Sequence, residues 1–353
     1  MKIQEIPTPA LIIEKDAFES NFRTMADLLK RFPAMRLYPH YKSHKCLAIA
    51  QRQMAEGAGG ITCAKLSEAE DLVRGGIPVV VIANQITQPE KFPRLAAIAN
   101  AADVTVCVDD AANIAALGAA MSEAGAKLRV LVEFEVGLNR CGVGTREEFL
   151  SLVEAVERQP ALVFDGIQAY AGQLSHEVDD AARRSGIEAK ERKVRELKAF
   201  VEAAGHPCRN VAGGSTGTVA EKPSDTVYTQ LQAGSYLLLD STYTTLPLPF
   251  RQSLYVLTRV ISVKSGRAVL DGGVKSFTMD QHAPVLSDLP GVRFDLNEEH
   301  VILFDPPESL KVNDLVRIVP GHCCTTMNAN AVVFVVAGDE VVDRIAITAR
   351  GES

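Results

Sequence analysis

The sequence predicts an α/β protein that consists of a (β/α)8 TIM-type barrel and a C-terminal, mostly β domain. From about residue 35 onward, short apolar segments typical of strands alternate with helix-like segments, and eight such strand signals can be counted. Near-continuous apolar strands that alternate with helices indicate a parallel sheet covered on both faces. Eight such units are the pattern of a (β/α)8 barrel. A doubly wound sheet is the alternative, but it offers no reason for the number eight.

Helix and turn signals follow most of the eight expected strands. Ser67 is a fair helix N-cap with acidic residues in the first turn after it, and Gly75-Gly76 ends that helix. Asp109 or Asp110 caps another helix, which runs to Ala124. The helices are expected at residues 67–74, 89–100, 110–124, 146–158 and 179–204. The strands are expected at residues 35–37, 60–65, 78–84, 104–108, 128–136, 163–171, 210–212 and 230–239.

Beyond about residue 245 the pattern changes to short β-rich segments separated by turn residues, with no helix of any length between them. The apolar run after Thr8-Pro9 can add a strand to the same sheet. We therefore place the barrel at residues 21–244 and a β-rich domain at residues 1–20 together with 245–353. Its C-terminal strands are expected at residues 253–263, 267–271, 300–304, 315–319, 331–336 and 341–348.

Composition indicates a cytoplasmic protein that acts on small molecules. The formal net charge of −7 argues against nucleic acid as the main partner. No apolar stretch approaches the roughly 18 residues of a membrane span. The N-terminus has no apolar signal-peptide core. Seven cysteines in a long chain without a signal suggest reduced thiols in a cytosol.

The stretch from Tyr38 to Lys45 joins an expected strand to an expected helix, and such junctions carry the chemistry of α/β folds. Strand alternation would place His40 and Lys42 on one face and Tyr41 on the other. A lysine at the end of an inner strand is partly desolvated, which makes its amine nucleophilic, as Schiff-base formation requires. The alternative interpretation is a solvated basic loop.

A glycine-rich turn follows the expected seventh strand, with the sequence Gly213-Gly214-Ser215-Thr216-Gly217-Thr218. Glycines let the backbone approach a phosphate, and the hydroxyl groups add donors to the backbone N–H groups. Barrels commonly bind phosphate after strands seven and eight. The turn lacks the Gly-Lys-Ser/Thr of a P-loop. It is therefore either a phosphate site of another kind or a turn without a ligand.

The run Gly321-His322-Cys323-Cys324 follows an expected strand of the β-rich domain. In an extended segment, His322 and Cys324 point to one face and Cys323 to the other. One imidazole and one thiolate suit zinc, and two protein ligands leave room for water or substrate. The alternative is a buried thiol beside a structural histidine. A disulfide between Cys323 and Cys324 would be strained.

Two further candidates lie at strand ends of the barrel. Arg140 stands in a glycine-flanked turn after the fifth strand, and Tyr170 lies near the end of the sixth. Glu133 and Glu135 alternate with apolar residues on the fifth strand, so either is an inward-facing carboxylate or an ion-pair partner.

Together these motifs resemble the fold-type III pyridoxal phosphate enzymes, whose barrel is that of alanine racemase. More narrowly, the chain resembles the D-threonine aldolase and D-3-hydroxyaspartate aldolase group, with the metal-dependent D-serine dehydratases as relatives. The resemblance covers nearly the whole chain, in order. It is carried by residues 8–11, 39–45, 133–137, 140–143, 168–172, 213–218 and 232–236, by Asp271 with Asp280, and by residues 320–324.

The resemblance implies a role for each candidate. Lys42 would be the Schiff-base lysine of pyridoxal 5'-phosphate, with His40 beside it among the cofactor-binding residues. Arg140 and Tyr170 would line the cofactor ring. His322 and Cys324 would bind a divalent metal near the substrate hydroxyl. The phosphate would be held by Gly214, Ser215, Thr216, Gly217 and Thr218, together with Gly234, Ser235 and Tyr236.

Three positions depart from the aldolase pattern. Cys324 stands where the aldolases carry aspartate, a choice seen in the dehydratases, and it favours zinc over manganese or magnesium. Residues 326–330 lack the usual His-Asp or Tyr-Asp pair, and Tyr38 stands where arginine is common. These departures leave the reaction type open.

The resemblance implies a homodimeric lyase that cleaves D-3-hydroxy amino acids to glycine and an aldehyde. The alternative is dehydration of D-serine or D-threo-3-hydroxyaspartate to ammonia and a keto acid. An amino acid racemase and a non-catalytic carrier of pyridoxal phosphate are further alternatives, and the β-rich domain argues against the carrier.

Overall fold

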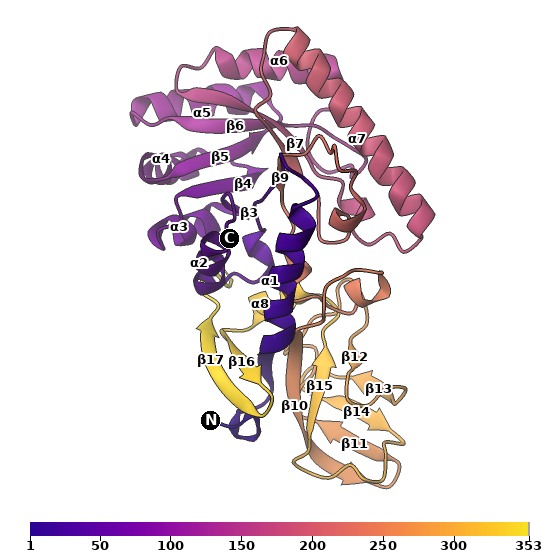
Figure 1. The fold of residues 1–353 in the computed structure, drawn as a ribbon. Helices are drawn as coiled ribbons and strands as arrows, with labels where there is room; N and C mark the ends of the chain where they lie inside the picture. Colours follow the sequence, from indigo (N-terminus) through magenta and orange to yellow (C-terminus); the bar gives the residue numbers. More distant parts are fainter. Residues whose placement is uncertain (352–353) are drawn as a thin grey trace. The chain divides into compact units, whose positions relative to one another are not determined.

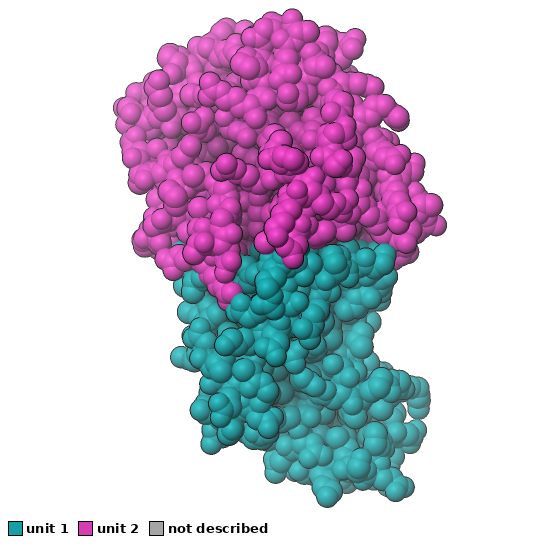
Figure 2. Space-filling view, in the orientation of Figure 1, with its two compact units in different colours: residues 1–25, 43–48, 235–351 teal, residues 26–42, 49–234, 352–353 magenta. Residues whose placement is uncertain are grey.

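The computed structural model describes residues 1–351, which divide into two compact units (Figure 2). The barrel unit comprises residues 26–42 and 49–234, and the β unit comprises residues 1–25, 43–48 and 235–351. The chain thus passes between the units after residues 25, 42, 48 and 234. The boundaries expected from sequence, 20/21 and 244/245, lie five residues before the first and ten residues after the last of these points. Within the described residues, no helix is long and apolar enough to cross a membrane.

The barrel unit is built on an eight-stranded parallel sheet in the order β2-β9-β8-β7-β6-β5-β4-β3 (Figure 1). An isolated parallel bridge between His40 and Thr62 joins its two edges and closes the barrel. The strands are β2 (Arg36–Leu37), β3 (Ile61–Cys63), β4 (Val79–Gln85), β5 (Asp103–Val108), β6 (Leu128–Glu133), β7 (Leu162–Ala169), β8 (Asn210–Gly213) and β9 (Gln230–Leu231).

The helices of the barrel unit begin where the sequence provides caps. The Asp110 carboxylate accepts a hydrogen bond from Asn113 N–H, and Thr145 forms a capping box with Glu148. Successive helices from α3 to α7 pack side by side along the strands (Figure 1). The helices are α2 (Leu47–Ala55), α3 (Leu66–Arg74), α4 (Phe92–Ala101), α5 (Ala111–Glu123), α6 (Arg146–Glu157) and α7 (Asp180–Ala203), while α1 (Lys15–Leu29) and α2 each span a division between the units.

Alternation along the parallel strands buries small and branched side chains. Val81, Cys107, Leu131 and Ala212 come from four different strands and form one buried cluster, against which Tyr38 packs. These apolar residues fill the interior along the strands, and polar residues stand at the carboxyl ends of the strands. The predicted (β/α)8 barrel is confirmed.

The β unit contains a nine-stranded sheet whose main path is β13-β14-β11-β10-β1-β16-β17 (Figure 1). The predicted N-terminal strand is present as β1 (Ala10–Glu14), which pairs antiparallel with β10 and parallel with β16. The other strands are β10 (Leu254–Lys264), β11 (Arg267–Leu270), β12 (Val285–Leu286), β13 (Arg293–Leu296), β14 (Val301–Phe304), β15 (Leu315–Val319), β16 (Val332–Ala337) and β17 (Glu340–Ala346).

The β unit contains a helix that the sequence-based expectation lacks. A helix, α8 (Cys323–Ala329), follows β15, where no helix was expected. Its first backbone N–H, that of Cys323, donates to Asp240 Oδ2 at 2.8 Å. Thr326 Oγ1 accepts from Thr278 N–H at 3.1 Å. These partners lie far away in sequence and stabilise a helix in a segment of two cysteines and two threonines, which local preference does not favour.

Candidate active site

Lys42 lies in a 3-10 turn, Tyr41–Ser43, and not in the extended strand end expected from sequence. Tyr41 is buried and its hydroxyl donates to Asp71 Oδ2 at 2.6 Å, which anchors the turn. His40 Nδ1 accepts a 3.4 Å hydrogen bond from Lys42 N–H. The Lys42 side chain is exposed, so the expected partial desolvation by the strand is wrong. An exposed amine at the end of the first barrel strand is accessible to a carbonyl ligand.

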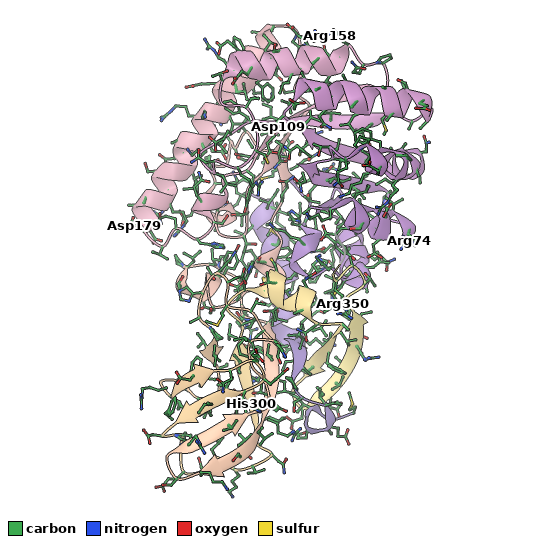
Figure 3. The ribbon with its side chains drawn as sticks, turned by 180° about the vertical axis from the view of Figure 1, so that it is seen from behind. Arg74, Asp109, Arg158, Asp179, His300 and Arg350 are labelled. Atoms are coloured by element: carbon green, nitrogen blue, oxygen red, sulfur yellow. The ribbon has the colours of Figure 1, made fainter. Side chains whose placement is uncertain are left out.

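Polar side chains collect at the carboxyl ends of β4, β5 and β6. Glu133 ends β6 and is buried, and its Oε2 accepts a 2.6 Å hydrogen bond from Gln85 Nε2 at the end of β4. Burial raises the pKa of the Glu133 carboxyl, although Gln85 and Arg140 oppose the shift. Asp109, labelled in Figure 3, follows β5 and accepts from Gly142 N–H at 2.9 Å.

Arg140 and Tyr170, both proposed from the resemblance to line the cofactor ring, are neighbours. The Arg140 guanidinium lies 5.5 Å from the centroid of the Tyr170 ring and 3.7 Å from Glu133 Oε1. The ion pair and the ring hold the guanidinium at the strand ends. Tyr170 itself follows β7 and is half-buried, and its hydroxyl lies 3.4 Å from Ser175 Oγ.

The glycine-rich turn is shaped by backbone conformations that favour glycine. Gly214 has a φ of 75°, and a Cβ at Gly217 would lie 2.0 Å from the carbonyl oxygen of Ser175. Thr218 Oγ1 accepts from Ser215 N–H at 3.1 Å and closes the turn. Thr216 Oγ1 is buried and has no hydrogen-bond partner among the described residues. A buried hydroxyl without a partner, in a turn of this kind, fits a bound phosphate oxygen.

The segment Gly234-Ser235-Tyr236 spans the division of the chain into units. Gly234 ends the barrel unit, while Ser235 and Tyr236 begin the β unit in a short 3-10 helix, Ser235–Leu237. Both side chains are buried, and the Tyr236 ring packs against Phe250 with centroids 5.8 Å apart.

His322 and Cys324 stand at the N-terminus of α8, with His322 as its N-cap residue. The extended geometry expected for this segment is therefore wrong beyond His322, because Cys323 begins the helix. Cys323 is buried while Cys324 is partly exposed, and neither forms a disulfide bond; their sulfur atoms lie 4.0 Å apart. Burial acts to lower the pKa of His322, but Cys324 and Asp280 outweigh it and raise this pKa to about 9. The imidazole of His322 and the Cys324 side chain are thus close enough for a hydrogen bond.

Two carboxylates, to which the sequence motifs assigned no role, contact the segment from His322 to Cys324. His322 Nδ1 lies 2.8 Å from Asp280 Oδ2, and Thr325 Oγ1 donates to Asp280 Oδ1 at 2.8 Å. Burial raises the pKa of Asp240, which accepts from Cys323 N–H. Metal-bound histidines usually bond a carboxylate through their other ring nitrogen, so this donor set fits a divalent cation. Asp240 could have been noticed as a lone acid after the apolar run Leu237 to Leu239.

Asp280→Asn should weaken metal binding by about 10- to 100-fold, because the carboxylate that orients the His322 ring would become a neutral amide. The measurement is a competition titration of the purified protein with a chelating metal indicator. Asp295→Asn is the matched control, since Asp295 is an exposed carboxylate on β13 of the same unit. An unchanged metal affinity in Asp280→Asn would show that Asp280 does not orient a ligand.

The structure thus groups the candidates within each unit. Arg140 and Tyr170 lie together in the barrel unit, which also holds Lys42 and the glycine-rich turn, whereas His322 and Cys324 lie in the β unit. The described residues contain no group of three or more histidine, cysteine or acidic side chains arranged to hold a metal ion.

Two family models match the chain. The model of the alanine racemase N-terminal domain matches residues 13–242, which is more than half of the chain. The chain belongs to the alanine racemase N-terminal domain family. A second model, the putative serine dehydratase domain, matches residues 253–336. The family implies pyridoxal phosphate as the cofactor. The recognition made from the motifs is confirmed.

Two relatives that match over nearly the whole chain are aldolases. The chain is 36% identical over 365 residues to 3-hydroxy-D-aspartate aldolase of Paracoccus denitrificans, with 100% of this chain and 94% of the relative covered. The crystal structure of D-threonine aldolase from Filomicrobium marinum superposes with a TM-score of 0.94 at 37% identity, covering 99% of this chain and 98% of the other. The chain is therefore homologous to carbon-carbon lyases.

A dehydratase is a more distant relative. D-threo-3-hydroxyaspartate dehydratase from Delftia sp. HT23 superposes with a TM-score of 0.84 at 25% identity, covering 98% of each chain. Solved mutants of D-threo-3-hydroxyaspartate dehydratase replace a histidine and a cysteine two positions apart, and the cysteine mutant is in the metal-free form.

Proposed function

We propose that this protein is a pyridoxal phosphate- and divalent-metal-dependent lyase that cleaves D-3-hydroxy amino acids, D-threonine or D-3-hydroxyaspartate among them, to glycine and an aldehyde. The observation that carries the proposal is the full-length similarity to two aldolases, at 36% and 37% identity, against 25% for the dehydratase structure. The substrate is expected to be a small D-amino acid, since both relatives are named for such substrates.

In the barrel unit, Lys42 would hold the cofactor covalently through its exposed amine. Pyridoxal phosphate supplies an electron sink for the charge that develops at Cα. Arg140 would contact the ring system from a position held by Glu133 and Tyr170. The glycine-rich turn would bind the phosphate through its backbone N–H groups and the hydroxyl of Thr216, with Gly234, Ser235 and Tyr236 as further phosphate residues.

In the β unit, His322 and Cys324 would hold a divalent cation, with zinc favoured by the thiolate and manganese or magnesium as alternatives. Such a cation supplies positive charge that eases loss of the proton from the β-hydroxyl group of the substrate. Asp280 would keep the imidazole oriented for the metal. When the hydroxyl loses its proton, the Cα–Cβ bond breaks and Cβ leaves as the aldehyde carbon. The bonding electrons remain on Cα, which takes up a proton to give glycine.

The second candidate function is dehydration of D-serine or D-threo-3-hydroxyaspartate to ammonia and a keto acid. One observation favours it: the His-x-Cys spacing of His322 and Cys324 equals that of the histidine and cysteine replaced in the dehydratase mutants. Loss of the Cα proton, followed by departure of the β-hydroxyl group, distinguishes this reaction from cleavage of the Cα–Cβ bond.

Product analysis separates the two functions. The purified protein would be incubated with D-threonine, D-serine and D-threo-3-hydroxyaspartate, with and without added zinc or manganese. Glycine with an aldehyde or glyoxylate is the expected result. Ammonia with a keto acid would overturn the aldolase proposal in favour of the dehydratase. Turnover of none of the three substrates in the presence of cofactor and metal would contradict both.

We further propose a cytoplasmic homodimer, on the basis of the resemblance to fold-type III enzymes. Light scattering coupled to size-exclusion chromatography would measure the mass in solution. A mass of one 38.0 kDa chain would contradict the dimer.

A further inference from the structure

Lys222 is a buried cation beside the glycine-rich turn, with only 4% of its side chain exposed. It follows the short 3-10 helix Val219–Glu221, which leads directly out of the turn. Desolvation lowers the pKa of its ammonium. Lysine is rarely buried without a partner. The residues around Lys222 must therefore offset the free-energy cost of removing its ammonium from water.

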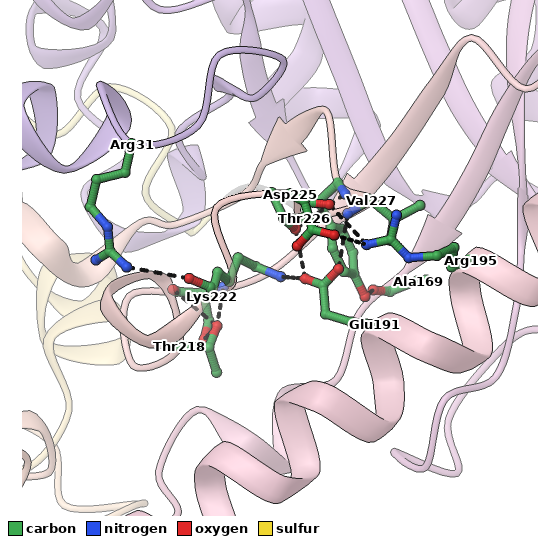
Figure 4. A network of polar contacts seen from close by, with 11 residues as sticks. Arg31, Ala169, Glu191, Arg195, Thr218, Lys222, Asp225, Thr226 and Val227 are labelled. Atoms are coloured by element: carbon green, nitrogen blue, oxygen red, sulfur yellow. Dashed lines mark hydrogen bonds and ion pairs between the residues drawn. The ribbon is translucent and has the colours of Figure 1, made fainter.

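The Lys222 ammonium contacts two side chains of a larger polar network (Figure 4). Its Nζ donates to Glu191 Oε1 at 2.8 Å and lies 3.7 Å from the centroid of the Tyr228 ring. Glu191 also accepts from Thr226 Oγ1 at 2.6 Å and from Val227 N–H at 2.9 Å. A carboxylate with these three donors is well supported as an anion, and it holds Lys222 as the cation.

The network is tied to β7, whose last residue, Ala169, pairs with Gly213 at the start of the turn. The Tyr228 hydroxyl donates to the carbonyl oxygen of Ala169, the last residue of β7, at 2.9 Å. A Cβ placed on Gly214 would lie 3.1 Å from Lys222 Cε and 4.0 Å from its Nζ. Lys222 also lines a small cavity together with Gly214 and Thr218. The ammonium therefore lies directly against the glycine-rich turn.

Stability alone does not account for this pair. Replacing a buried ion pair with apolar side chains of similar volume is often neutral or stabilising. The Lys222 ammonium lies against a turn that fits a phosphate. This position offers a reason why a buried lysine is present here.

We propose that Lys222 is a positioning residue for the glycine-rich turn, whose buried ammonium makes the turn favour a phosphate over an uncharged group. This inference rests on the proposed function, because it takes the turn to hold the cofactor phosphate. Glu191 anchors the ammonium from the side of α7, and Tyr228 restrains it through its ring. Because this ammonium is buried, it attracts a phosphate more strongly than it would in bulk water.

The test compares pyridoxal phosphate with pyridoxal, which lacks only the phosphate, as ligands of the cofactor-free protein. Both dissociation constants are measured by absorbance titration. In Lys222→Met/Glu191→Gln, which leaves no unpaired buried charge, the dissociation constant for pyridoxal phosphate should rise at least about tenfold, or ~1.4 kcal/mol. The constant for pyridoxal should change by less than about twofold. Arg195→Met is the matched control. Arg195 is a half-exposed cation on α7, the helix that also carries Glu191, and it bonds Asp225. This substitution should alter neither dissociation constant.

Equal changes in both dissociation constants, or no change in either, would overturn the role of Lys222. Thr216→Val in the same titration separates this failure from failure of the phosphate assignment. If Thr216→Val weakens only the binding of pyridoxal phosphate while the Lys222 variant does not, the turn binds phosphate and the Lys222 inference alone is wrong. If neither variant alters the preference for pyridoxal phosphate, the phosphate assignment of the turn fails and the inference fails with it.

Discussion

Lys42→Ala should abolish the near-visible absorbance of the bound cofactor and lower lyase activity by at least about 10³-fold, or ~4 kcal/mol in the barrier. The reason is chemical, because only an amine can form the covalent bond to the cofactor carbonyl. The Lys42 side chain is exposed in a turn anchored by buried Tyr41, so its removal should leave the fold intact. Absorbance spectra of the purified variant and initial rates on D-threonine are the measurements.

Lys65→Ala is the matched control for Lys42→Ala. Lys65 is also an exposed lysine near the carboxyl end of a barrel strand, since it follows β3 by two residues. The control should keep both the absorbance and the activity. A Lys42→Ala protein with an unchanged spectrum would disprove the assignment of Lys42, and loss of the spectrum in Lys65→Ala instead would reassign the bond to that residue.

Removing either proposed metal ligand should have the second large effect. His322→Ala and Cys324→Ala should each lose bound metal and about 10²-fold or more in kcat, as expected if the metal contributes ~3 kcal/mol to the transition state. The cofactor absorbance should remain, because neither side chain supplies the amine that binds the cofactor. Metal analysis of the purified protein and single-substrate kinetics measure the two effects separately.

Cys323→Ala controls for the loss of a thiol from the same segment. Cys323 is buried beside Cys324, so its truncation should reduce stability modestly, by about 1 kcal/mol, while metal content and kcat persist. Full activity in both His322→Ala and Cys324→Ala would remove the metal from the mechanism. Retained metal in both variants would place its ligands elsewhere in the chain.

The course of the barrel could be predicted because its signals are local. Asp110 and Thr145 cap helices through hydrogen bonds three residues along the chain, and the apolar strands between helices alternate at a regular interval. The two short strands β12 and β13 of the β unit were missed, since runs of two and four residues carry little pattern. The expected strand 230–239 is paired only at Gln230–Leu231, and a 3-10 helix occupies part of the remainder.

The candidate site likewise has features that the sequence could predict and features that it could not. The lysine, the glycine-rich turn and the His-x-Cys pair could be identified from residue types and their order, and this order also indicated the family. Local spacing could not predict that Glu133 and Gln85, 48 residues apart, share a hydrogen bond. Nor could it predict that Asp280 orients His322 across 42 residues.

The sequence by itself determined the barrel, the β-rich domain and the chemical types at the site, because caps, periodicity and short motifs act over a few residues. Only the tertiary structure decided that Cys323 begins a helix, that Lys42 is exposed in a 3-10 turn, and that Lys222 is buried against the glycine-rich turn. Each of these depends on a partner distant in sequence, such as Asp240, Asp71 or Glu191, which chain folding alone brings close.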